Sequence, residues 1–109
     1  MIVANQTMID EIVDGLLVDA DDDYLGLWQI VSRVSGQSKS LSEEGIRDQA
    51  FKVIRSLLKH GLVAGDLKSD GSFERWLVDD ADVINKIEMR WNELGRAPEI
   101  GDICWFNKI

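Results

Sequence analysis

Apolar residues recur at helical spacing in the first third of the chain. One stripe takes positions i, i+1, i+4, i+5, i+8 and i+9, filled by Met8, Ile9, Ile12, Val13, Leu16 and Leu17. This spacing predicts a helix over residues 8–18, which the acidic run 19–23 ends. A second stripe, with Leu25, Trp28 and Val31, predicts a helix over residues 24–34.

The most regular stripe lies in the middle of the chain and comprises Ile46, Ala50, Val53, Ile54, Leu57 and Leu58. Ser42 is a suitable N-cap for this third helix, and Gly61 is a suitable residue to end it. A fourth apolar stripe predicts a helix that begins at Asp79 or Asp80 and ends at Gly95.

Between the third and fourth helices the pattern changes from helical to alternating. Residues 62–67 and 73–78 are typical of two short strands. The Asp70-Gly71 pair between them is a strong signal for a tight turn. We therefore predict a β-hairpin at this position.

Together these elements predict a single domain over residues 1–109, mostly α with a β-hairpin. The order is that of a winged-helix domain, with the polar loop 35–40 inside its helix-turn-helix and an additional C-terminal helix. Residues 96–109 are predicted to form an irregular tail against the body. Its Trp105 either covers the core or anchors a partner, and we favour the first. The other tryptophans, Trp28, Trp76 and Trp91, are predicted to lie in the core.

Charge changes this picture because the chain is acidic and the acids are unevenly placed. It has 20 Asp and Glu against 12 Lys and Arg, a formal net charge of −8. No Lys or Arg precedes Arg33. The seven acids before it are Asp10, Glu11, Asp14, Asp19, Asp21, Asp22 and Asp23. Such a surface attracts basic proteins and repels nucleic acid, so these seven residues are the candidate partner-binding site.

Catalytic and metal chemistry find little support in the sequence. The run from Asp19 resembles a calcium loop, but Tyr24 stands where the loop requires glycine and Ile30 where it requires glutamate. His60, the one histidine, is expected to cap a helix, and Cys104, the one cysteine, to be a small buried residue. We expect no enzyme activity, no metal and no cofactor.

The alternative function is DNA binding by the third predicted helix. Arg47, Lys52, Arg55 and Lys59 would give this helix a basic side suited to a DNA groove. Acidic residues share the same helix and the hairpin, and this leaves few contacts for phosphate. We therefore favour the solvated-surface interpretation of the four basic residues.

Two segments resemble a group of small uncharacterised bacterial proteins. They are residues 57–67 and 91–106, the second containing Gly101-Asp102-Ile103-Cys104-Trp105-Phe106. The group shares the ending Gly-Asp-Ile-x-Trp-Phe and implies no activity. In size and acidity the chain also resembles immunity proteins of contact-dependent growth inhibition and related polymorphic toxin systems, a likeness of type that transfers no site residues.

These patterns favour an immunity protein that binds and neutralises a basic toxin domain, which we expect to be a nuclease. A winged-helix transcriptional regulator is the alternative, and a small enzyme using His60 or Cys104 is a third hypothesis. The N-terminal residues lack the pattern of a secretion signal, and no apolar run has the length of a membrane span. We therefore expect a cytoplasmic protein with no membrane or small-molecule ligand.

Overall fold

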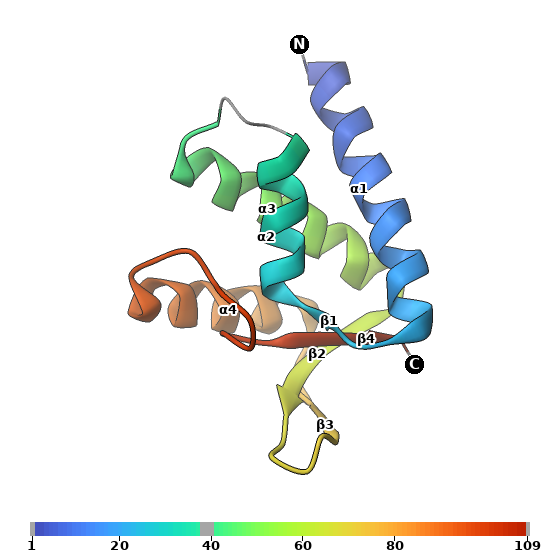
Figure 1. The fold of residues 1–109 in the computed structure, drawn as a ribbon, viewed down its shortest axis with the longest axis vertical. Coiled ribbons are helices and arrows are strands. Elements are labelled where there is room, and N and C mark those ends of the chain that lie inside the picture. The colour runs from blue at the N-terminus through green and yellow to red at the C-terminus, as the bar shows by residue number, and fades with distance from the viewer. Residues whose placement is uncertain (1, 38–40, 109) are drawn as a thin grey trace.

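The computed structural model describes residues 2–37 and 41–108, with side chains from Thr7 onward. The described residues form four helices and four strands (Figure 1). In chain order these are α1 (Ile2–Asp22), β1 (Leu25–Gly26), α2 (Leu27–Gln37), α3 (Glu43–Lys59), β2 (Leu62–Leu67), β3 (Phe73–Arg75), α4 (Asp80–Leu94) and β4 (Trp105–Lys108). The mostly helical fold with a β2–β3 hairpin is the predicted class. Residues 38–40 of the predicted loop lie outside the described residues.

Local capping sets the ends of α3 and α4, as predicted. The Ser42 hydroxyl accepts the backbone N–H of Gly45 at 3.1 Å, and a carboxylate oxygen of Asp79 accepts that of Asp82 at 2.9 Å. Gly95 ends α4 with a φ of 70°, a left-handed conformation that costs glycine little. His60 is the C-cap of α3, and its Nδ1 lies 2.8 Å from the Ser56 carbonyl oxygen.

Helix α1 is longer than predicted, because the acidic run does not end it. It continues to Asp22, and Ala20 within the run is buried in the core. Distant cations neutralise part of the charge in its last turns. Arg33 from α2 pairs with Asp19 at 2.6 Å, and Lys108 from β4 pairs with Asp21. These pairs offset the repulsion that carboxylates meet at a helix C-terminus.

The predicted irregular tail is wrong at its end, where residues 105–108 form strand β4. This strand lies inside the sheet, whose order is β1-β4-β2-β3 with antiparallel neighbours throughout. Trp105 stands opposite Gly26 on one side and Gly65 on the other. The same pairing corrects the second helix, which begins at Leu27 because Leu25 and Gly26 are drawn into the sheet.

The second strand of the hairpin ends earlier than predicted, at Arg75. The Trp76 backbone N–H still donates to the Ala64 carbonyl, but the Trp76 indole turns to the Asp66 carboxylate, which accepts its N–H at 2.8 Å. Leu77 is 88% exposed, so the alternation of buried and exposed residues stops here.

The two faces of the sheet have different surroundings. Residues opposite each other in an antiparallel sheet share a face, so Leu25, Phe106 and Ala64 lie together on one side. All three belong to the hydrophobic core, which residues of all four helices complete. We call this side the core face. Figure 1 shows α1, α2 and α3 on one side of the sheet, with the β2–β3 hairpin extending away from them.

Two polar networks order the C-terminal part, and the first ties it to this body. Arg90 of α4 donates to the Asp66 carboxylate at 2.9 Å and to the Ile103 carbonyl at 2.8 Å. Burial raises the pKa of Asp66, but the hydrogen bonds from Trp76 and Arg90 and the charges of Arg90 and Lys86 outweigh it and hold that pKa below its usual value. Arg90 thereby ties α4, β2 and the segment before β4 together.

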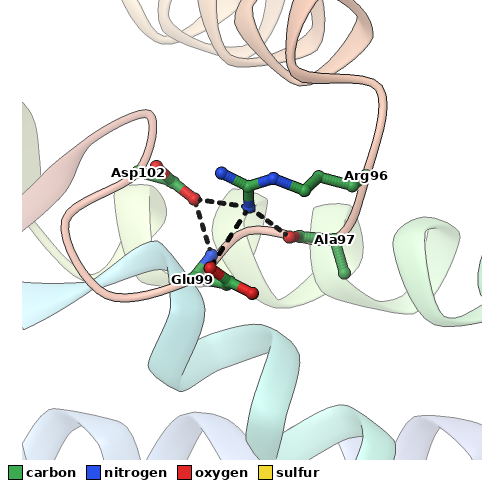
Figure 2. A network of polar contacts seen from close by, with 4 residues as sticks. All are labelled: Arg96, Ala97, Glu99 and Asp102. Atoms are coloured by element: carbon green, nitrogen blue, oxygen red, sulfur yellow. Dashed lines mark hydrogen bonds and ion pairs between the residues drawn. The ribbon is translucent and has the colours of Figure 1, made fainter.

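The second network lies within the loop between α4 and β4 (Figure 2). The Asp102 carboxylate accepts the Glu99 backbone N–H at 2.8 Å and an Arg96 N–H at 2.9 Å. These bonds lower the pKa of Asp102. The loop also contains a strained residue, Ile103, with a φ of 69° that β-branched side chains rarely adopt. The bonds to the Ile103 carbonyl and to the Asp102 carboxylate hold the backbone in this conformation just before β4 begins.

Candidate protein-binding surface

The acidic residues predicted as a partner site lie along the exposed side of α1. Its opposite side carries buried Ile9, Ile12, Val13, Leu16 and Ala20. The exposed acids on the outer side are Asp10, Glu11, Asp14, Asp21 and Asp22. We call these five, together with Val18, the α1 acidic side.

Val18 gives the α1 acidic side an apolar centre. It is 65% exposed, and the helical spacing places Asp14, Asp21 and Asp22 three or four residues from it. Among the described residues, Glu11, Asp14 and Asp22 form no ion pair. An exposed apolar side chain with charged residues around it is the pattern of an interface centre with a polar rim.

Two of the seven predicted acids, Asp19 and Asp21, form ion pairs with basic residues. This corrects the expectation that no base compensates these acids. Asp19 is half-buried and pairs with Arg33, whose guanidinium lies against Gly15 where a Cβ would be 2.6 Å from it. Asp21 pairs with Lys108. Because both cations come from distant segments, the charge distribution along the chain gave no sign of them.

A hollow of about 610 Å³ lies at the C-terminal end of α1. Its lining comprises Ala20, Asp21, Asp22, Asp23, Tyr24, Asn107 and Lys108. Asp23 accepts the Tyr24 backbone N–H at 2.7 Å. The hollow lies between the C-terminal end of α1 and the end of β4, where Lys108 contributes a cation.

The sheet face opposite the core was missed by sequence reasoning. By register it carries Val63, Gly65, Leu67, Phe73, Arg75, Trp105 and Asn107, and Gly26 lies beside Trp105. Val63 supports the assignment of these residues to the side away from the core, since it is 9% exposed yet lies outside the core cluster. We call this side the outer sheet face.

Aromatic rings cover much of the outer sheet face. The Phe73 ring stacks on Tyr24 with centroids 5.5 Å apart, and both are half-buried. The glycines make this possible. A Cβ on Gly65 would lie 2.8 Å from the Phe73 ring, and one on Gly26 would lie 2.7 Å from Trp28 and 3.3 Å from Trp105.

These positions correct two predictions about tryptophan. Trp105 does not cover the core, because it lies on the opposite side of the sheet and is half-buried. Trp28, expected in the core, is half-buried beside Gly26. Trp76 and Trp91 are each 7% exposed, as predicted for core residues. The available signal was the alternation of residues 105–108, in which Phe106 and Trp105 must face opposite sides of a strand.

The basic residues of the DNA-binding alternative are split by the packing of α4. Arg47 lies over the Trp91 ring, 5.1 Å from its centroid, and is thereby fixed between α3 and α4. Lys52, Arg55 and Lys59 are exposed further along α3. The first turn of α3, which a recognition helix would present to base edges, carries Glu43 and Glu44 instead.

A hollow of about 750 Å³ separates this part of α3 from α4 and the loop after it. Four carboxylates line it, those of Glu43, Glu44, Asp48 and Glu88. Arg47 and Arg96 also line it, so carboxylates outnumber cations on this surface. The geometry therefore weakens the DNA-binding alternative.

The two residues considered for catalysis are Cys104 and His60. Cys104 is 2% exposed, and burial raises the pKa of its thiol, so the nucleophilic thiolate is suppressed. The His60 ring lies against the end of its own helix. In the part of the chain that the structure describes, no three or more His, Cys, Asp or Glu side chains are grouped to hold a metal ion.

Comparison with protein families, characterised proteins and solved structures gives no significant match. None of the helices among residues 2–37 and 41–108 combines the length and apolar character needed to cross a membrane. The function therefore has to be argued from the surfaces themselves.

Proposed function

We propose that this chain is a non-catalytic binding protein that neutralises a basic protein, in the manner of an immunity protein acting on a nuclease toxin domain. The observation that carries the proposal is the α1 acidic side, a row of exposed carboxylates about an exposed Val18. We place this activity in the cytoplasm, where such a toxin would act.

The physical basis is electrostatic complementarity. Clustered carboxylates speed the encounter with a cationic surface and disfavour partners of the same sign. A nuclease active site is shaped to receive phosphate, and a row of carboxylates presents similar charge to it. Ion pairs at the rim add little each, so the affinity must also draw on apolar contacts such as Val18.

The test uses the basic protein recovered in complex with this chain from its native host and then purified. Reversing three unpaired acids of the α1 acidic side, in the variant Glu11→Lys, Asp14→Lys, Asp22→Lys, should weaken binding at least about a hundredfold. The matched control, Asp48→Lys, Glu88→Lys, Glu93→Lys, makes the same change in net charge on α3 and α4. It should weaken binding far less, and calorimetry compares the two.

Salt provides a second measurement on the same pair. The association rate of the unaltered protein should fall steeply as salt is raised, because salt screens charges separated by more than about 10 Å at 0.1 M. Equal effects of the two triple variants, or binding that is indifferent to salt, would contradict the proposal.

A further inference from the structure

We infer that the outer sheet face is the second half of the partner interface, where the rings of Tyr24, Phe73 and Trp105 receive arginine side chains of the basic partner. This inference rests on the proposed function, since it assumes a cationic protein partner. It adds the chemistry that selects the partner's side chains.

The first reason is the state of the rings themselves. Rings at the edge of the core are each covered by a cation from this chain: Arg47 and Arg55 over Phe51, Arg47 over Trp91, and Lys86 and Arg90 over Trp76. Among the described residues, no Lys or Arg lies over Tyr24, Phe73 or Trp105. These three rings therefore have no cation–π contact within the described part of the chain, and a cation of the partner can supply one.

The second reason is that carboxylates adjoin one of these rings, that of Tyr24. The hollow at the end of α1 places Asp22, Asp23 and Tyr24 around one space, with Asn107 of the outer sheet face on its wall. A guanidinium is planar, so it can stack on a ring while its N–H groups donate to a carboxylate. A lysine ammonium lacks the planar group and satisfies this arrangement less well.

The third reason is that glycines stand beneath the rings of Phe73 and Trp105. Gly65 is so close to β3 that a Cβ would lie 2.2 Å from the Glu74 carbonyl oxygen, and its bare backbone lets Phe73 lie across it. Gly26 does the same for Trp28 and Trp105. Both glycines therefore allow aromatic rings to lie close against the backbone of the outer sheet face.

One cation on the outer sheet face opposes a basic partner and therefore reports on docking there. Arg75 is exposed, stands opposite Gly65 on this face and forms no ion pair with another described residue. The charged groups at its margin are the Lys68–Glu74 pair, 3.4 Å apart, and Asp23 near Tyr24. Lys108 lines the same hollow as Tyr24 and Asn107, and there it pairs with Asp21.

The experiment titrates the full chain with two synthetic peptides of equal charge, nona-arginine and nona-lysine. Nona-arginine should bind at least roughly threefold tighter, because arginine stacks better on aromatic rings. The double variant Tyr24→Leu, Phe73→Leu should remove this preference. Equal binding of the two peptides to the unaltered protein overturns the inference.

A gain of affinity provides the sharper readout, since misfolding cannot produce it. Arg75→Glu should tighten nona-arginine binding by roughly three- to tenfold relative to Lys52→Glu. Both substitutions change the net charge equally, but Lys52 lies on α3. Equal effects of the two reversals overturn the inference.

The triple variant Glu11→Lys, Asp14→Lys, Asp22→Lys separates the two ideas. If it abolishes peptide binding while Arg75→Glu and Lys52→Glu behave alike, the α1 acidic side binds cations without the sheet. The inference then fails and the proposed function stands. If the triple variant binds nona-arginine as well as the unaltered chain, the proposed function itself fails.

Discussion

The aromatic residues of this molecule fall into two sets that differ in burial. Phe51, Trp76, Trp91 and Phe106 are buried in the core, and the first three are also covered by the chain's own cations. Tyr24, Trp28, Phe73 and Trp105 lie half-buried on or beside the outer sheet face. The core rings are buried, whereas the outer rings are half-buried and have no cation over them among the described residues. Adjacent residues of one strand, Trp105 and Phe106, belong to different sets.

Truncating one ring on each face of the sheet should show how differently the two sets of rings contribute to the free energy of unfolding. Phe106→Ala removes a fully buried ring and should cost about 3–5 kcal/mol of unfolding free energy. Phe73→Ala should cost only about 1 kcal/mol, since its ring is half-exposed and loses mainly its stacking on Tyr24. Urea denaturation of the two variants measures both values. Similar losses would show that the outer ring is as structural as the inner one.

Adding a methyl group at the glycines tests whether the outer rings depend on bare backbone. Gly65→Ala should cost roughly 2–3 kcal/mol, because the added carbon meets the Glu74 carbonyl oxygen of β3. Gly36→Ala, in the last turn of α2 with no atom within 4 Å of its Cβ, should stabilise by about 0.5 kcal/mol. Thermal unfolding compares them, and a neutral Gly65→Ala would refute the proposed close approach.

Two cations lie over the Trp76 ring, and removing each in turn should show which of them stabilises the fold more. Arg90→Ala loses the bonds to Asp66 and Ile103 as well as the contact with Trp76, so it should cost about 1–3 kcal/mol. Lys86→Ala loses the ring contact with Trp76 and should cost about 0.5 kcal/mol. The same urea series gives both values. A larger loss for Lys86→Ala would mean that ring coverage, not the network, holds α4.

The smallest expected effect is a pH dependence at Asp66. Its folded pKa is lowered, so the ionised carboxylate adds stability above the usual carboxyl range, and this is lost as pH falls through the lowered value. The stability gap between the unaltered protein and Asp66→Asn should therefore be present near about pH 7 and close in acid. Urea midpoints across pH measure it. A gap that widens in acid would reverse the assigned sign.

Local chemistry accounts for what the sequence predicted well. Ser42, Asp79 and Gly95 set helix ends through bonds that reach at most a few residues, so their roles can be recognised in isolation. The apolar stripe of α3 likewise depends on spacing alone.

Long-range pairing accounts for what the sequence did not predict. Strand β4 forms by pairing with β1 and β2, where Trp105 stands opposite Gly26 and Gly65. Both glycines are far from Trp105 in the sequence. Helix α1 continues into its acidic run with cations from Arg33 and Lys108. The outer sheet face depends on β4, so it could not be foreseen before the strand order was known.

The most direct test of the account is a nuclear magnetic resonance titration of the ¹⁵N-labelled chain with nona-arginine, following the four indole N–H signals and the α1 amides. The account predicts that Trp28, Trp105, Glu11 and Asp14 signals shift together, while those of Trp76 and Trp91 stay in place. Shifts confined to Trp76 and Trp91, or an unmoved α1, would contradict it.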